Sequence, residues 1–330
     1  MTTPVFARHT RLRRTPALRA LLRETQLEPR RFIAPVFVTD DDALAGPIAG
    51  LPGIARYPVR DVAAAVAAID ALGVGGILLF GVPGRKDDDG SGAVSPDGVV
   101  ARALATIRGV APGLVIAVDV CRCQFAPDGQ CAVMGNGGID TDASLDWIGR
   151  ASVAAANAGA TLVAPSGMID GAVQQIRGAL DRHGHGDVGI LSYAVKHASG
   201  LYGPFREAAR SAPGQGDRRS HQLDPSNARE ALREAASDVG EGADILMVKP
   251  ALTNLDTLVR LRATYPGTPL AAFEVSGEYA MVRAAADRGW LDERTVALEA
   301  LTAVVRAGAD IVVTYRAVEA ARWLQEDRAR

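Results

Sequence analysis

Eight short apolar runs alternate with longer segments of helical periodicity from Arg31 to the end of the chain. The runs are continuous and rich in β-branched residues, which is typical of parallel strands that are covered on both faces. They comprise Phe32–Val38, Gly76–Phe80, Leu114–Val120, Thr161–Pro165, Val188–Tyr193, Asp244–Lys249, Pro269–Val275 and Asp310–Tyr315. The pattern therefore predicts eight parallel strands.

Helices are predicted between these strands. Apolar residues recur at helical spacing within Asp61–Leu72 and Asp292–Ala307, while Asp224 followed by Pro225 predicts an N-cap and a first helical turn. Glycines that suit left-handed helix ends precede four of the strands, at Gly73, Gly159, Gly242 and Gly308. Eight βα units in a row predict an α/β fold, the (β/α)8 TIM barrel. The alternative is a doubly wound open sheet, but the GxGxxG turn expected after its first strand is missing.

Composition narrows the class of protein. The chain has 330 residues, a net charge of −2 and 48% hydrophobic residues, so it is long enough to bury a large core and too apolar to stay disordered. The near-neutral charge argues against a general nucleic-acid binder. No apolar run approaches the roughly 18 residues of a membrane span. We expect a single barrel domain over residues 32–330.

Residues 1–31 are predicted to form a separate N-terminal arm. The segment has no serine and contains Glu24 and Glu28, which argues against a transit peptide, and it has no apolar core of a signal peptide. Two interpretations remain open: a solvated arm, or an arm that packs on a neighbouring subunit. Its eight arginines are Arg8, Arg11, Arg13, Arg14, Arg19, Arg23, Arg30 and Arg31.

Only three of the 36 basic residues are lysines: Lys86, Lys196 and Lys249. In a barrel the chemistry lies at the C-terminal ends of the strands, where Lys196 follows the fifth strand and Lys249 ends the sixth. The apolar sequence around Lys249 and a second ammonium nearby both predict a lowered pKa, and Schiff-base catalysis requires a neutral amine. The alternative is a lysine that extends to solvent or pairs with Glu274. We expect Lys86, in a polar loop, to be solvated or to belong to a lid.

The three cysteines, Cys121, Cys123 and Cys131, fall within one short stretch after the third strand. Three thiolates without a fourth cysteine or a histidine in the same loop suit a zinc ion that keeps one position open, as catalytic sites do. The alternative is three buried cysteines that bind no metal. An odd number of cysteines and no secretory leader predict a reducing compartment, the cytoplasm.

Six motifs complete the picture: Arg11–Arg14 (RLRR), Asp119–Cys131 (DVCRCQFAPDGQC), Ser192–Lys196 (SYAVK), Tyr202–Glu207 (YGPFRE), Leu246–Pro250 (LMVKP) and Val275–Met281 (VSGEYAM). Their combination resembles the porphobilinogen synthase family, also called δ-aminolevulinic acid dehydratases. The resemblance covers essentially the whole chain, and the two lysine motifs are its most specific part. It implies a lyase of tetrapyrrole (heme) biosynthesis that condenses two molecules of 5-aminolevulinate to porphobilinogen with loss of two waters.

The resemblance also implies roles for individual residues. Lys249 would form the Schiff base, Lys196 would serve the second substrate beside the zinc, and Asp119 would handle protons or orient an amine there. The residues expected to bind substrate are Ser276 and Tyr315 on the first carboxylate, Arg206, Arg218 and Gln222 on the second, and Tyr202 and Phe205 in the same motif region. Whether Lys196 forms a second imine or acts only as a cation is left open.

Because all three cysteines are present, the chain resembles the zinc-using branch of the family. The family also implies a homo-octamer built with N-terminal arms and an allosteric Mg²⁺ site, with Glu234 as its ligand. An exposed helix glutamate is the alternative for Glu234. Where many relatives have Ser-Tyr-Gln, this chain has Ser220-His221-Gln222.

Two other functions compete with this interpretation. A class I aldolase also uses a barrel lysine, but it should carry a glycine-rich phosphate loop after strands seven and eight, and it leaves the cysteines unexplained. A non-catalytic zinc-binding scaffold would bind metal without turnover. Neither alternative predicts a membrane or nucleic-acid partner.

Overall fold

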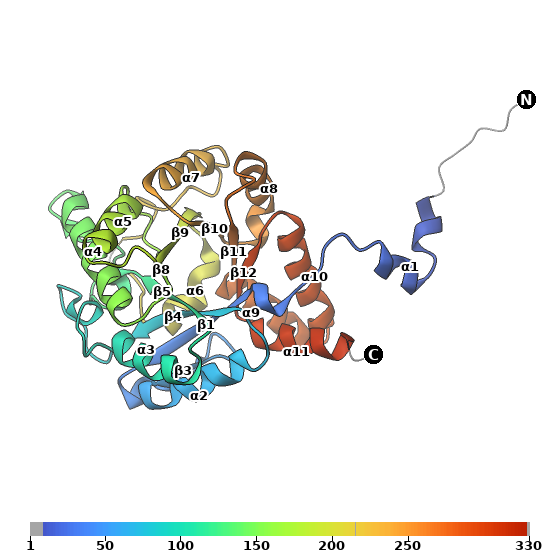
Figure 1. Cartoon of the computed structure of the whole chain (residues 1–330), viewed down its shortest axis with the longest axis horizontal. Coiled ribbons are helices and arrows are strands. Elements are labelled where there is room, and N and C mark those ends of the chain that lie inside the picture. Colours follow the sequence, from blue (N-terminus) through green and yellow to red (C-terminus); the bar gives the residue numbers. More distant parts are fainter. Residues whose placement is uncertain (1–8, 215, 329–330) are drawn as a thin grey trace, which may run out of the picture.

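Eight parallel strands close into a barrel in the computed structural model, which describes residues 9–214 and 216–328 (Figure 1). Each strand pairs with the next along the chain, and the last pairs with the first at Phe32–Val312. The strands are β1 (Phe32–Thr39), β4 (Gly76–Val82), β5 (Val115–Val120), β8 (Leu162–Pro165), β9 (Gly189–Lys196), β10 (Ile245–Lys249), β11 (Leu270–Glu274) and β12 (Ile311–Thr314). The predicted (β/α)8 barrel is therefore confirmed, and the open-sheet alternative is wrong.

Strand β9 extends furthest beyond its predicted end. Strand β9 continues three residues beyond Tyr193, because Val195 and Lys196 pair with Val248 and Lys249 of β10. Lys196 is thus the last residue of the strand and does not follow it.

Helices surround the barrel and return the chain between successive strands (Figure 1). They are α2 (Val59–Asp70), α3 (Val99–Val110), α4 (Thr141–Asn157), α5 (Ala172–Arg182), α7 (Glu230–Glu241), α8 (Leu255–Thr264), α10 (Glu293–Arg306) and α11 (Ala317–Arg328). All four predicted helix-end glycines have left-handed backbone, with φ between 73° and 124°.

The predicted start of α7 is wrong. The helix begins at Glu230, not near Pro225, because Asp224 accepts a hydrogen bond from the backbone N–H of Ser226 at 2.8 Å and closes a turn. Leu223, just before it, is held in a parallel bridge to His197. By contrast, α10 begins close to its predicted start: Asp292 is its N-cap and accepts a hydrogen bond from the backbone N–H of Thr295 at 2.7 Å.

Short additional elements lie at the ends of the barrel. β3 (Ala55–Pro58) extends the sheet beside β1, with β2 (Gly46–Pro47) antiparallel to it, and β6 (Met134–Gly135) pairs with β7 (Gly138–Ile139). After β9 come the 3-10 turn η6 (Gly200–Tyr202) and α6 (Gly203–Ala208), and α9 (Ser276–Asp287) follows β11.

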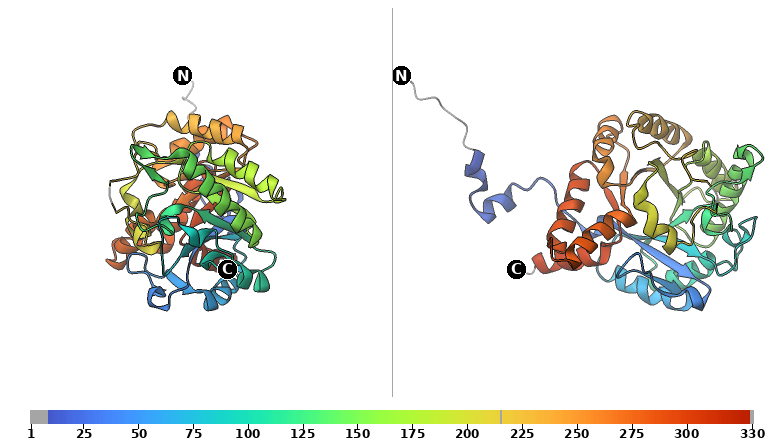
Figure 2. Two further views of the ribbon diagram at one scale, coloured as in Figure 1. Left: turned by 90° about the vertical axis from the view of Figure 1, so that its left-hand side faces the viewer. Right: turned by 180° about the vertical axis from the view of Figure 1, so that it is seen from behind.

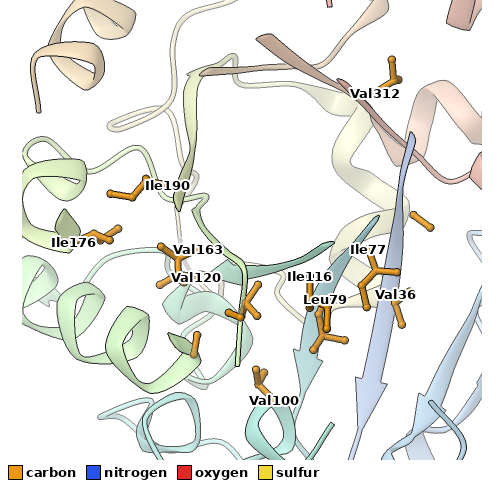
Figure 3. Packing of buried hydrophobic residues seen from close by; sticks show 14 of the residues in the cluster. Val36, Ile77, Leu79, Val100, Ile116, Val120, Val163, Ile176, Ile190 and Val312 are labelled. Carbon is orange, nitrogen blue, oxygen red and sulfur yellow. The ribbon is translucent and has the colours of Figure 1, made fainter. Parts of the chain in front are cut away.

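The core has two layers. Side chains such as Val36, Ile77, Leu79 and Ile116 point outward from the strands toward the helices, as Figure 3 shows. A second cluster fills the interior of the barrel and includes Leu78, Ala117, Leu191, Met247 and Val313. Because the interior is packed, only the ends of the strands can hold a substrate.

The chain before β1 leaves the barrel (Figures 1 and 2). Its 3-10 turn η1 (His9–Arg13) and helix α1 (Pro16–Leu21) contain no buried residue, and the side chains of Leu12 and Leu21 are 57% and 79% exposed. Arg8 and the other residues of 1–8 lie outside the described part of the predicted arm. Across the described residues, no helix combines the length and apolar character needed to cross a membrane.

Candidate active site

Lys196 and Lys249 are neighbours at the C-terminal ends of β9 and β10, where they lie opposite each other in the strand register. Both side chains are buried. Their Nζ atoms lie 5.6 and 5.2 Å from the ring centre of Tyr193, and 6.0 and 5.5 Å from that of Tyr202. The two amines therefore share one enclosed, aromatic-walled space.

The surroundings of Lys249 are apolar. Its Nζ lies 3.9 Å from the ring centre of Phe273 and 5.1 Å from that of Phe205. Burial, followed by the charge of Lys196, lowers the pKa of Lys249 from 10.5 to about 7. Glu274, the acid considered as a partner, instead accepts a hydrogen bond from Arg316 at 3.3 Å. Lys249 thus neither extends to solvent nor pairs with Glu274, and much of it is a neutral amine at neutral pH.

Lys196 has a polar partner that Lys249 lacks. Its Nζ donates to the carbonyl oxygen of Ser166, at the end of β8, at 2.5 Å. Its backbone N–H donates to the sulfur of Met168 at 3.2 Å. These contacts hold Lys196 toward the β8 side of the barrel mouth.

Asp119 lies at the base of the same space. Its carboxylate accepts a hydrogen bond from Nε2 of Gln124 at 2.5 Å and one from the hydroxyl of Tyr193 at 3.1 Å. Burial and the neighbouring Cys121 thiol raise its pKa to about 7, against the opposing effect of the two lysines. A carboxyl group with such a pKa can both accept and donate a proton near neutral pH.

The three cysteines form one buried cluster after β5. The sulfurs of Cys121 and Cys123 are 3.1 Å apart, and all three lie within 4.8 Å of one another. Hydrogen bonds from the other two thiols lower the pKa of Cys131 well below its ordinary value, and the charge of Arg218 acts in the same direction. In the part of the chain that the structure describes, no other three His, Cys, Asp or Glu side chains are grouped in this way. The donor set suits a metal ion that accepts sulfur ligands.

Residues 199–214 and 216–223, here called the lid segment, lie over the strand ends. The hydroxyl of Tyr202 donates to the carbonyl of His197 at 2.6 Å, and the ring of Phe205 packs edge-on against Phe80 at 5.1 Å. Ser276 holds the segment from the other side: its hydroxyl donates to the carbonyl of Leu201 at 3.1 Å and accepts from the N–H of Phe205 at 3.0 Å. The lid segment therefore closes over Lys249.

The lid segment carries donors that no protein atom satisfies. Nε of Arg206, Nε of Arg218 and Nε2 of Gln222 are buried and have no hydrogen-bond partner. Arg218 also donates to the carbonyls of Gly129 and Ser211, which fixes its side chain against the cysteine loop. Buried donors without partners are costly unless a ligand pairs with them, and these belong to the three residues predicted to bind a carboxylate.

Comparison with known proteins decides the identity. Residues 6–323 match the family model described as delta-aminolevulinic acid dehydratase. The chain belongs to this family. It is 46% identical over 323 residues to the delta-aminolevulinic acid dehydratase of Halalkalibacterium halodurans, with 98% of each chain covered. It is 48% identical over 321 residues to that of Mycobacterium tuberculosis, covering 96% of this chain and 97% of the relative.

A solved structure agrees with the family. The chain superposes with a TM-score of 0.95 and 39% identity on the delta-aminolevulinic acid dehydratase (porphobilinogen synthase) of Toxoplasma gondii in complex with the reaction product porphobilinogen, covering 98% of this chain and 93% of that one. As a member of this family, the protein is a lyase of porphyrin biosynthesis that condenses two molecules of 5-aminolevulinate to porphobilinogen. The aldolase and scaffold alternatives are therefore wrong.

Glu234 lies on α7. Burial and the nearby Asp170 and Glu230 carboxylates raise its pKa. Together with His221 these residues line a cavity of about 410 Å³ that also reaches Gln222 of the active site. The predicted magnesium ligand thus belongs to an acidic cavity that adjoins the active site, and no three of its acids come close enough to count as a metal-binding group within the described residues.

The sequence patterns missed several residues of this dehydratase's site. Gln124 and Tyr193 hold Asp119, and Phe273 covers Lys249. Lys86 is half-buried, not solvated: its Nζ donates to the carbonyls of Cys123 at 3.2 Å and Arg210 at 2.5 Å. Gln124 adjoins Cys123 in the sequence and could have been flagged from that position, whereas nothing local marks the other three.

Proposed function

We propose that Lys249 of this delta-aminolevulinic acid dehydratase forms the Schiff base with the first 5-aminolevulinate. The observation that carries this proposal is the burial of Lys249 beside Lys196, which lowers its pKa to about 7. The neutral amine attacks the ketone carbon of the substrate, and one water leaves as the imine forms. The positive charge of the protonated imine then acidifies the adjacent carbon for the condensation.

Ser276 and Tyr315 bind the carboxylate of this first substrate. Both are buried at the ends of β11 and β12, next to Phe273 and opposite Phe205. The hydroxyl of Ser276 holds the lid segment, so substrate binding there and lid closure use the same group. The aromatic rings exclude water from the imine, which favours its formation.

Arg206, Arg218 and Gln222 bind the carboxylate of the second substrate. Their unpaired buried donors support this assignment, because a carboxylate accepts hydrogen bonds from guanidinium groups and amides. Asp119, held by Gln124 and Tyr193, moves protons between the second amine and the condensing carbons. Lys196 supplies a positive charge or a second amine at this side of the site.

Zinc is the metal we infer for Cys121, Cys123 and Cys131, since three clustered sulfurs without a fourth protein ligand leave one position open. When bound, the ion acts as a Lewis acid toward the carbonyl or amine of the second substrate. After the hydrogen bonds from the other two thiols, the charges of Arg218 and Lys196 also lower the pKa of Cys131, which favours the deprotonated form that metal binding requires.

Assembly and regulation are further parts of the proposal. The exposed apolar side chains of Leu12 and Leu21 support an arm, residues 1–31, that packs on neighbouring barrels (residues 32–330) and builds a homo-octamer. Glu234 would hold an allosteric Mg²⁺ in its acidic cavity. Three free thiols fit a reducing compartment, the cytoplasm.

Chemical trapping tests the central assignment. The enzyme is incubated with 5-aminolevulinate, reduced with borohydride and mapped by mass spectrometry. We expect the adduct on Lys249, and none in Lys249→Met. An adduct confined to Lys196, or its complete absence from an active preparation, would contradict the assignment.

A further inference from the structure

Arg316 follows Tyr315 directly at the end of β12, and its side chain is completely buried. All three guanidinium nitrogens donate to protein acceptors. Nε donates to Glu274 Oε1 at 3.3 Å, one terminal nitrogen to Glu293 Oε1 at 2.5 Å, and the other to the carbonyl of Tyr279 at 2.7 Å. With these donors engaged, Arg316 does not bind a substrate anion itself.

Glu274, the other half of this pair, is equally buried at the end of β11. It accepts a hydrogen bond from the hydroxyl of Thr314, which lies opposite it in the strand register and precedes Tyr315. The same hydroxyl accepts from the backbone N–H of Arg316 at 3.0 Å. Both chain neighbours of Tyr315 are therefore tied to the Glu274 carboxylate.

Tyr279 connects this network to the site. The guanidinium carbon of Arg316 lies 4.4 Å from the centre of the Tyr279 ring. The centres of the Tyr279 and Tyr315 rings are 5.8 Å apart. The Tyr279 hydroxyl donates to the carbonyl of Pro52 at 2.5 Å and accepts from Arg283 at 3.0 Å. Tyr279 lies on the first turn of α9, the helix that begins with Ser276.

We propose that the buried Arg316–Glu274 pair positions Tyr315 and Ser276 for the carboxylate of the first-bound keto acid. This inference rests on the proposed function of those two residues. Removing a charged pair from water is expensive, and packed apolar side chains would stabilise the fold as well or better. The ion pair instead fixes the local geometry. The planar guanidinium group of Arg316 is hydrogen-bonded to residues of three other elements, and it thereby holds the ends of β11 and β12 and the start of α9 in fixed relative positions.

Substitution of the pair separates positioning from stability. Arg316→Met leaves the buried Glu274 carboxylate without its partner, which by itself destabilises the fold. The double variant Glu274→Met/Arg316→Met, which removes both buried charges, is therefore made as well. The conservative variant Glu274→Gln completes the set. Arg294→Met is the matched control, because this arginine pairs with Glu326 and Asp327 on the outer helices. Melting temperature reports folding in each.

The readout is the 5-aminolevulinate concentration that gives half-maximal borohydride trapping on the Schiff-base lysine. We expect it to rise about tenfold in the Arg316→Met and double variants, with less change in Glu274→Gln and none in the control, because small displacements of binding groups weaken productive contacts steeply. A folded double variant with unchanged half-saturation would overturn the proposal and leave the pair a purely structural element.

A double-mutant cycle distinguishes this inference from the function on which it rests. Tyr315→Phe alone should raise the half-saturating concentration, and Arg316→Met should raise it by a smaller factor in that background than in the parent enzyme, because part of its effect acts through the Tyr315 contact. If Tyr315→Phe has no effect, the proposed role of Tyr315 fails. If Tyr315→Phe acts and Arg316→Met does not, or if their effects multiply, only the positioning role fails.

Discussion

Lys196 and Lys249 lie opposite each other in the register of two adjacent parallel strands, and both amines face the rings of Tyr193 and Tyr202. Side chains at equivalent positions of neighbouring strands share one face of the sheet, so the register forces the two amines together. Their repulsion and burial lower the pKa of Lys249. The fold thereby keeps part of this amine neutral near neutral pH.

The rate of trapping at Lys249 should follow the titration of its amine. Because the neutral form attacks the ketone, the initial rate should rise between about pH 6 and pH 8, around the pKa of about 7, and then level off. Lys196→Met removes one cause of the lowered pKa and should move this profile to higher pH. Trapping kinetics measured over this range check both expectations; an unmoved profile in Lys196→Met would contradict the coupling.

Burial of Lys249 also lowers the free energy of unfolding at neutral pH. The unfolded lysine has a pKa near 10.5 and the folded one about 7, so the unfolded state binds more protons and stability rises with pH across this window. Lys249→Met should therefore raise the melting temperature at pH 7 by about 2–4 °C while abolishing turnover. The gain should shrink as the pH approaches 10. A loss of stability at pH 7 would show that the amine is favourably paired.

Metal content should depend on the cysteine cluster. Cys123→Ala removes one of three sulfurs that lie within 4.8 Å of one another, and should lose bound zinc and turnover while circular dichroism shows an intact barrel. Chelation of the parent enzyme should give the same loss, and added zinc should restore the parent but not the variant. Full activity of metal-free parent enzyme would refute the zinc role.

The second carboxylate site is tested by Arg206→Gln. Because Nε of Arg206 is buried without a protein partner, this change should lower kcat/KM by about 10- to 100-fold, the value of a charge-assisted hydrogen bond. Trapping at Lys249 should persist, since the first substrate does not use this residue. The control is Arg219→Gln, an exposed arginine in the same segment. Equal loss of trapping and turnover would place Arg206 in the first site instead.

Lys86 should hold the cysteine loop and the lid segment together. Its two hydrogen bonds, to the carbonyls of Cys123 and Arg210, are lost in Lys86→Met. Tryptic cleavage after Arg210 should then accelerate by about 5- to 30-fold, the equivalent of losing one or both hydrogen bonds at about 1 kcal/mol each. Arg85→Met, an exposed neighbour, should leave the cleavage rate unchanged; the same acceleration in both variants would exclude this role of Lys86.

The barrel architecture follows from the sequence alone, because periodicity is a local property of the chain. All eight strands were predicted within a few residues, since each parallel strand is apolar on both faces. The lowered pKa of Lys249 was also predictable from the apolar run around it, and the clustering of the three cysteines from their spacing. Even the error at α7 has a local cause: Asp224 followed by Pro225 predicts a helix cap, but its carboxylate closes a turn first.

Which distant residues meet depends on how the strands and helices pack. That Tyr193 reaches Asp119, that Lys86 reaches Arg210, and that Arg316 is a buried ion pair could not be predicted, because each contact joins elements far apart in the chain. Arginine is usually exposed, so its sequence position alone indicates a surface residue. Only the packing of the end of β12 against β11, α9 and α10 removes Arg316 from water and supplies the acids that stabilise it.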